Sequence, residues 1–236
     1  MNKLLDGSSD YLEYLDGWFT SLKPLKFIDI SPNPSNVAIL SVDVTEGFCS
    51  EGPLASPRVN RIVLPIKYLL EKTWSAGVRH VFLINDNHEM DAVEFQDYPP
   101  HCMRGSKESQ PVKEIKALPF FDEFDIIPKN SLSPNLNTDL PHSLKDLPGL
   151  KNFIVVGDCT DLCTYQLAMY LRLDANSRQM KNCRVIVPAD CVNTYDTSVD
   201  AARRIGAYPH PAELLHPLFL NHMASNGIEV VSKIDF

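Results

Sequence analysis

Cys163 stands at the junction of two different sequence patterns. The apolar run 153–156 before it is typical of a buried parallel strand, and Gly157 ends this run. From there on, hydrophobic residues recur at helical spacing, at Leu162, Tyr165, Met169 and Leu173. Cys163 is therefore predicted to lie near a helix N-terminus, where backbone N–H groups and the helix dipole lower the pKa of a thiol. A thiolate is a strong nucleophile, which favours covalent catalysis; a buried cysteine that only fills the core is the alternative.

Asp43 and Lys129 also stand at the ends of apolar runs. Asp43 closes the predicted strand 37–43, and Lys129 follows the predicted strand 124–128. Open α/β sheets bind their ligands outside the carboxyl ends of the strands, so we expect both residues beside Cys163. A carboxylate can accept the proton of a thiol, and an ammonium group can stabilise the negative charges of both. Taken singly, Asp43 can also be a loop cap and Lys129 a solvated lysine.

Asp86, His88 and His101 form a second candidate set. Asp86 and His88 follow the predicted strand 78–84, and His101 lies in the long loop after it. One carboxylate and two imidazoles, with positions left open for water or substrate, suit Zn²⁺, Fe²⁺ or Mn²⁺. We therefore expect one divalent metal ion, most readily zinc. A histidine after two prolines can also be purely structural.

The composition narrows the class of protein. The chain has 236 residues, 44% of them hydrophobic, and a net charge of -8 without a basic run. These values predict a globular protein that binds neither nucleic acid nor an anionic membrane surface. No apolar stretch is long enough to span a membrane, and the N-terminus lacks the apolar core of a signal peptide. Six scattered cysteines are typical of free thiols in a reducing cytoplasm, where we expect the protein.

Strand-like and helix-like segments alternate along the chain. Residues 1–35 are predicted to be an N-terminal extension with a helix over 11–22, and residues 36–236 a single domain. Alternation of this kind predicts an α/β, three-layer sandwich with a mainly parallel, six-stranded sheet flanked by helices. The expected strands are 37–43, 78–84, 124–128, 153–156, 184–188 and 228–231. The expected helices are 58–76, 111–118, a short one within 142–147, one beginning at Cys163, 197–206 and 211–226.

Three motifs make residues 37–236 resemble the nicotinamidase/pyrazinamidase group of isochorismatase-like cysteine hydrolases. The first runs from Val42-Asp43 to Gly47-Phe48-Cys49. The second joins Asp86-Asn87-His88 to Tyr98-Pro99-Pro100-His101-Cys102. The third is Gly157-Asp158-Cys159-Thr160-Asp161-Leu162-Cys163, and the segment 207–231, with His210-Pro211, is similar to that of plant-type members.

The resemblance implies a role for each motif residue. Cys163 would attack a carboxamide carbon, with Asp43 as base and then acid and Lys129 as the third catalytic residue. The N–H groups of Cys159 and Cys163 would form the oxyanion hole, next to a cis peptide bond between Asp158 and Cys159. Further implied roles are metal binding by Asp86, His88 and His101 and contact of Phe48 and Tyr98 with the aromatic ring of the substrate.

The implied activity is hydrolysis of nicotinamide, and of pyrazinamide, to the acid and ammonia through a thioester, in NAD salvage. The alternative within the superfamily is a cysteine amidase for a carbamoyl or ureido substrate, which needs no metal set. Isochorismatase itself is disfavoured because a vinyl-ether hydrolase does not need the cysteine. A non-catalytic binding protein is disfavoured by the presence of Asp43, Lys129 and Cys163 together. We expect a small amide as partner and a homo-oligomeric assembly.

Two departures from the family pattern stand out. Thr45-Glu46 replaces the Asn or Gln found in many members. We expect Glu46 to hydrogen-bond a metal-bound water, to join the coordination, or to shift the substrate preference. Residues 89–97 lack the extra histidine that some members carry, which leaves a fourth protein ligand without a candidate.

Overall fold

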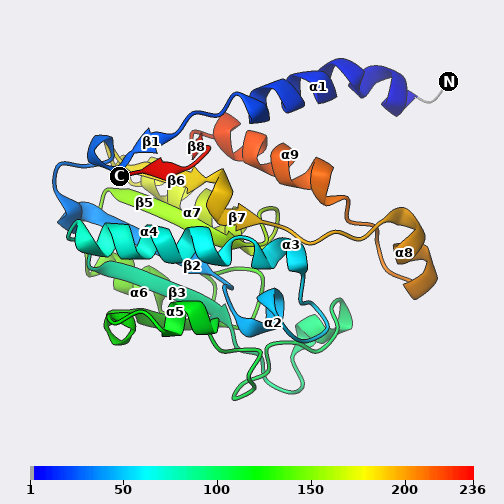
Figure 1. Ribbon diagram of the computed structural model, residues 1–236, viewed down its shortest axis with the longest axis horizontal. Coiled ribbons are helices and arrows are strands. Elements are labelled where there is room, and N and C mark those ends of the chain that lie inside the picture. Colours follow the sequence, from blue (N-terminus) through cyan, green and yellow to red (C-terminus); the bar gives the residue numbers. More distant parts are fainter. Residues whose placement is uncertain (1–2) are drawn as a thin grey trace.

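The computed structural model describes residues 3–236 as alternating strands and helices (Figure 1). The strands are β1 (Leu25–Lys26), β2 (Val37–Val42), β3 (His80–Asp86), β4 (Asp125–Lys129), β5 (Asn152–Asp158), β6 (Arg184–Pro188), β7 (Val192–Asn193), β8 (Glu229–Val231) and β9 (Ile234–Asp235). The helices are α1 (Lys3–Thr20), α2 (Glu46–Cys49), α3 (Pro57–Asn60), α4 (Val63–Ser75), α5 (Lys113–Lys116), α6 (Leu140–Lys145), α7 (Cys163–Ser177), α8 (Val199–Ile205) and α9 (Ala212–Ser225).

The central sheet is parallel throughout. Six strands follow the order β4-β3-β2-β5-β6-β8, and the short β7 pairs with the end of β5, which makes seven strands in all. The predicted six strands are thus all present, and β7 is an addition. Two residues carry no periodicity, so the sequence pattern gave no signal for β7, nor for the separate pair of β1 and β9.

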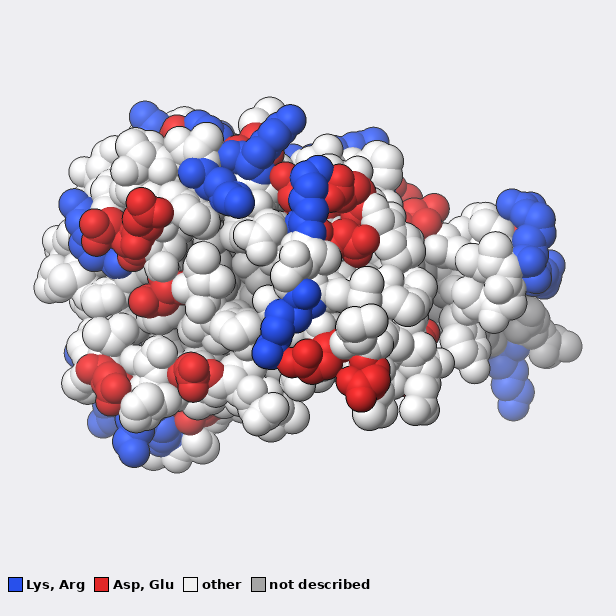
Figure 2. All heavy atoms as spheres, turned by 90° about the horizontal axis from the view of Figure 1, so that it is seen from below, with Lys and Arg blue, Asp and Glu red and all other residues white. Residues whose placement is uncertain are grey.

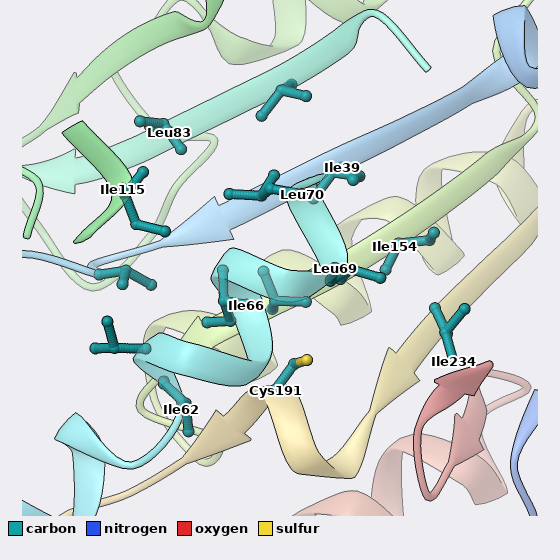
Figure 3. Packing of buried hydrophobic residues seen from close by; sticks show 14 of the residues in the cluster. Ile39, Ile62, Ile66, Leu69, Leu70, Leu83, Ile115, Ile154, Cys191 and Ile234 are labelled. Atoms are coloured by element: carbon teal, nitrogen blue, oxygen red, sulfur yellow. The ribbon is translucent and has the colours of Figure 1, made fainter. Parts of the chain in front are cut away.

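Alternate residues of the central strand β2 face two different cores. Val37 and Ile39 pack with α4, and Figure 3 shows Ile39 among Ile66, Leu69 and Leu70 of that helix. Ala38, Leu40 and Val42 face the other side. Both faces of a parallel sheet are normally covered, so its central strands are buried at every position, as β2 is; Ser41 is its one polar residue.

Helices cover the two faces as the three-layer prediction requires. The first face is covered by α4 and α5, whose Ile66 and Ile115 are completely or almost completely buried. The second face is covered by α6, α7 and α9, through Leu140, Leu167 and Leu220. The predicted helix 58–76 is two helices, α3 and α4, with Arg61 and Ile62 between them.

The N-terminal segment lies against the body of the fold. Helix α1 runs beside α9 (Figure 1), and its Leu15 is buried. Further on, β1 pairs with β9, and Phe27 joins the core and stacks on Phe236. The domain boundary at residue 36 stays a prediction.

Two features concern the partners of the protein, namely the distribution of its surface charge and the apolar character of its helices. On the face in Figure 2, acidic and basic side chains are interspersed rather than gathered into one field. Within residues 3–236, no helix combines the length and the apolar character that crossing a membrane requires.

The parallel sheet brings four polar strand ends to one edge. Asp43 directly follows β2, Asp86 ends β3, Lys129 ends β4 and Asp158 ends β5. The register pairs Asp86 with Lys129 across β3 and β4, so these two side chains start from neighbouring positions. This edge contains the candidate site.

Candidate active site

Asp43, Lys129 and Cys163 are brought together in one buried cluster. Lys129 Nζ lies 2.8 Å from Asp43 Oδ2 and 3.5 Å from Cys163 Sγ. Asp43 Oδ1 accepts a hydrogen bond of 2.8 Å from the backbone N–H of Asp86. All three side chains are almost completely removed from solvent. The predicted set therefore exists as a cluster around one ammonium group.

Asp43 itself adopts an uncommon backbone conformation. Its φ is +55°, in the left-handed region that side chains other than glycine rarely occupy. Backbone strain of this kind persists where the surrounding structure enforces it, often at functional sites. Here, hydrogen bonds from Asp43 N to Ile84 O (2.9 Å) and from Thr45 N to Asp43 O (2.7 Å) hold the turn.

Burial dominates the protonation of the nucleophile. Helix α7 begins at Cys163, as predicted, yet burial raises the pKa of its thiol well above the usual value, and Lys129 only opposes this rise. The prediction that the helix N-terminus gives a lowered pKa is therefore wrong. The helix-dipole effect is small beside the cost of placing an anion in a dry site. The resting nucleophile is a neutral thiol.

The neighbouring carboxylate is suited to take the proton of that thiol. Burial raises the pKa of Asp43 to about 6, with a further rise from Asp86 and an opposing effect of Lys129. Burial also lowers the pKa of the Lys129 ammonium, but Asp43 and Asp86 outweigh it and raise that pKa well above its usual range. Lys129 is therefore a fixed positive charge, and Asp43 is a base with a pKa near neutrality.

The turn between β5 and α7 requires its glycine. Gly157 has φ of +115°, and a Cβ at this position would lie 2.0 Å from Val42 O. No side chain fits where β5 approaches β2 so closely. The next peptide bond, between Asp158 and Cys159, is cis, as the resemblance implied.

The two expected oxyanion-hole donors have no competing acceptor within residues 3–236. Around them, Thr160 N donates to Asn193 O (2.9 Å), and Leu162 N and Thr164 N donate to Cys159 O (3.0 and 3.2 Å). The N–H groups of Cys159 and Cys163 form no such bond. Buried amide groups are usually paired, so two unpaired ones at a turn are available to a ligand.

Asp86, His88 and His101 meet at the same edge. Their ligand atoms lie within 4.8 Å of one another, and all three residues are buried. Asp86 Oδ1 is 3.4 Å from His88 Nε2, and Asp86 Oδ2 is 3.4 Å from His101 Nε2. Lys129 also contacts Asp86; burial acts against its ionised form, but Lys129, His101 and His88 together outweigh burial and lower the pKa of Asp86.

These three residues fit a divalent metal ion. Both ring nitrogens of His88 are buried without a hydrogen-bond partner in the described chain, which is costly unless a ligand satisfies one of them. His101 Nδ1 lies 2.8 Å from Pro99 O, an interaction that leaves Nε2 free to bind a metal. The predicted set is thus assembled, and its nitrogen and oxygen donors suit zinc.

Glu46 does not join this group. Its carboxylate is engaged elsewhere, by the backbone N–H of Lys113 at 3.1 Å and by the hydroxyl of Ser50. Among the described residues, the candidate metal group contains only Asp86, His88 and His101. The expectation that Glu46 joins the coordination is therefore wrong.

Aromatic rings surround the histidines. The predicted substrate contacts Phe48 and Tyr98 both lie edge-on to His101, with ring centroids 5.5 and 6.4 Å away. Phe95 was not predicted, although its ring lies 5.3 Å from that of His88 and 5.7 Å from that of His101. It lies in the 3-10 helix Val93–Gln96, which is too short to show a periodicity, so only its aromatic character offered a signal.

Comparison with known protein families matches residues 37–233 to the isochorismatase domain. The chain belongs to the isochorismatase family. Its sequence is 29% identical to nicotinamidase 1 of Arabidopsis thaliana over 226 residues, which are 86% of this chain and 88% of that protein. The chain is an isochorismatase-like hydrolase, as the sequence predicts.

Solved structures show the same fold. The pyrazinamidase of Pyrococcus horikoshii in complex with zinc superposes with a TM-score of 0.61 at 22% identity, over 83% of this chain and 98% of that one. N-carbamoylsarcosine amidase of Thermoplasma acidophilum superposes with a TM-score of 0.60 at 23% identity, over 83% and 95%. The isochorismatase-like α/β fold predicted from the sequence is confirmed.

Proposed function

We propose that this protein is a metal-dependent amidohydrolase that converts nicotinamide, and pyrazinamide, to the acid and ammonia. The observation that carries the proposal is the meeting of two sets at one sheet edge, namely the buried Asp43–Lys129–Cys163 cluster and the Asp86–His88–His101 group. A carbamoyl amidase needs the first set but has no use for the second. The rings of Phe48, Phe95 and Tyr98 around the histidines favour a flat aromatic substrate.

Acylation begins with transfer of the Cys163 thiol proton to Asp43. The Sγ electron pair then forms a bond to the carboxamide carbon, and the carbonyl electrons move to oxygen. Lys129 stabilises the developing thiolate at 3.5 Å, and the N–H groups of Cys159 and Cys163 donate to the oxyanion. When the tetrahedral intermediate collapses, Asp43 returns its proton to the nitrogen, so that ammonia leaves and a thioester remains.

Deacylation repeats these steps with water. Asp43 removes a proton from the water, the hydroxide oxygen attacks the thioester carbon, and the sulfur leaves as a thiolate. Asp43 then gives the proton back to Cys163. Asp43, with its pKa of about 6, can act as base and as acid in turn. A divalent ion held by Asp86, His88 and His101 would act as a Lewis acid toward the pyridine nitrogen; we propose zinc.

The experiment that tests this proposal measures ammonia release from a panel of small amides. Nicotinamide and pyrazinamide are compared with N-carbamoyl and ureido compounds, each with and without a chelator. We expect the pyridine and pyrazine carboxamides to be preferred and chelation to abolish their turnover. Preference for a carbamoyl substrate with no effect of chelation would replace this function with the alternative amidase. Production of nicotinate places the enzyme in NAD salvage, which is also part of the proposal.

A further inference from the structure

A buried ion pair lies beside the turn that carries the nucleophile. His210, part of the His210-Pro211 element of the C-terminal segment, takes no part in the mechanism above. Its Nε2 lies 2.7 Å from Oδ2 of Asp161, a residue midway between Cys159 and Cys163. The side chains of His210 and Asp161 are 11% and 4% exposed. The pair therefore joins the C-terminal segment to the middle of the turn.

Both ring nitrogens of His210 face acceptors. Nδ1 lies 2.9 Å from the backbone carbonyl oxygen of Tyr195, while Nε2 faces the carboxylate of Asp161. A carbonyl and a carboxylate only accept hydrogen bonds, so both nitrogens must donate, and the ring is an imidazolium. The Tyr195 ring stacks on it at 3.8 Å between centroids and 16° between planes, which favours a cation. The bond to Asp161 is thus charge-assisted, and such bonds are the stronger kind.

The same carboxylate is held from a second direction. Asp161 Oδ1 accepts a hydrogen bond of 2.6 Å from the Thr194 hydroxyl. Thr194 directly follows β7, whose Asn193 O accepts the N–H of Thr160 at 2.9 Å. The turn is therefore tied to β7 through one backbone bond and to the residue after β7 through one buried carboxylate.

His210 is itself fixed at the base of the projecting segment that contains α8. Thr197 and His210 exchange two backbone hydrogen bonds, of 2.9 and 2.8 Å. Figure 1 shows α8 extending away from the sheet beyond this point. The imidazolium is thus held by its own backbone as well as by both of its ring nitrogens.

We propose that His210, acting through Asp161, is a positioning residue that holds the turn 159–163 so that its two N–H groups and the thiol meet one carbonyl group. The catalytic part of this inference rests on the proposed function. Oxyanion donors act mainly on the transition state, so a displaced turn lowers kcat and leaves KM nearly unchanged. An ion pair that only stabilised the fold would not lower kcat while leaving KM nearly unchanged.

The test uses the full-length chain and three variants. His210→Ala removes both donors, and His210→Gln restores an N–H donor that can reach Asp161. His142→Ala is the matched control, because His142 is an exposed histidine of α6 whose Nε2 faces Asp146 rather than a residue of the turn. Steady-state kinetics are measured on the amide that the wild-type chain hydrolyses fastest. Backbone hydrogen exchange of residues 158–166 is measured without substrate.

We expect His210→Ala to lower kcat about 10- to 100-fold with KM changed by less than about threefold. His210→Gln should recover part of this loss, and His142→Ala should match the wild-type chain. The N–H groups of Thr160, Leu162 and Thr164 should exchange faster in His210→Ala. If His210→Ala does not fold, kcat and hydrogen exchange of His210→Gln are compared with those of the control instead.

The inference is wrong if the His210 variants keep wild-type kcat, or if the turn exchanges no faster than in His142→Ala. The exchange measurement needs no substrate. A wild-type chain that hydrolyses none of the amides would therefore refute the proposed function, while exchange alone would still decide whether His210 positions the turn.

Discussion

At the scale of single residues, the site keeps its nucleophile neutral and its ammonium charged. Cys163 is a thiol because burial raises its pKa, and Lys129 contacts Asp43, Asp86 and Cys163 at once. An isolated thiolate would be costly in this dry site, so the proton must leave when substrate is in place. Asp43 is the neighbouring carboxylate that can accept this proton.

Metal binding is the first prediction at this scale. His101→Ala should lose the ion, because it removes one of two imidazoles from the three-residue group. His142→Ala is the control, since His142 lies on α6 with its side chain exposed. Elemental analysis after purification in zinc should give about one ion per chain for the control and much less for His101→Ala. Equal zinc content in both would contradict the assignment of His101.

The ion pair of Asp161 and His210 predicts a pH dependence of stability. Burial lowers the pKa of His210, but Asp161 opposes this with a hydrogen bond and its charge, and the pKa is raised above 6.5. Burial raises the pKa of Asp161, but His210 and the Thr194 hydroxyl together outweigh it and lower that pKa below 3.8. The ion pair therefore stabilises the fold fully between pH 3.8 and pH 6.5, the ordinary pKa values of the two groups. This stabilisation is lost as pH rises through the folded pKa of His210, or falls through that of Asp161.

Urea unfolding of the wild-type chain and of His210→Ala measures this contribution. The difference in unfolding free energy between the two chains should be about 1–3 kcal/mol at about pH 6 and clearly smaller at about pH 9. A difference that stays constant or grows over this range would contradict an imidazolium at position 210.

Residue chemistry was predictable where a residue type and a strand end coincide. Asp43, Asp86 and Lys129 follow or end strands, Cys163 begins the helix after one, and a parallel sheet has only one edge at which its carboxyl ends meet. The sequence could not predict the depth of burial, which decides the pKa of Cys163. Neither could it predict that Glu46 is engaged by Lys113 and Ser50, because both contacts depend on tertiary packing.

At the scale of elements, the close approach of β5 to β2 sets the position of the nucleophile turn. Gly157→Ala should lower the free energy of unfolding by about 2–4 kcal/mol, since its Cβ would lie 2.0 Å from Val42 O. Gly149→Ala is the matched control, because a Cβ there meets nothing within 4 Å. Equal unfolding midpoints in urea for the two variants would mean that the strands can separate without cost.

Elements with a clear period were predictable, and very short ones were not. The inner strands β2, β3, β5 and β6 contain long apolar runs, which a sheet covered on both faces requires, whereas the edge strands β4 and β8 are partly exposed. The two-residue strands β1, β7 and β9 exist only because partners elsewhere in the chain pair with them. The break between α3 and α4 did have a signal, Pro65 in the first turn of α4, because a proline cannot bond to the carbonyl of residue 61 and so cannot continue a helix from α3; the prediction of one helix over 58–76 overlooked it.

At the scale of the whole molecule, the N-terminal helix is packed onto α9 rather than extended into solvent (Figure 1). Leu15 is 3% exposed on α1, whereas Leu12 of the same helix is 43% exposed. Leu15→Ala should therefore lower the free energy of unfolding by about 2–4 kcal/mol, and Leu12→Ala by far less. Similar urea midpoints for the two would show that α1 does not contribute to the stability of the fold.

Covalent catalysis by Cys163 is the central claim for the molecule, and ammonia release from nicotinamide tests it most directly. The wild-type chain is compared with Cys163→Ala and with Cys183→Ala, a control that removes another buried, free thiol. We expect Cys183→Ala to remain active and Cys163→Ala to release no ammonia above the uncatalysed rate while keeping its far-ultraviolet circular dichroism. Substantial turnover by folded Cys163→Ala would contradict the thioester mechanism.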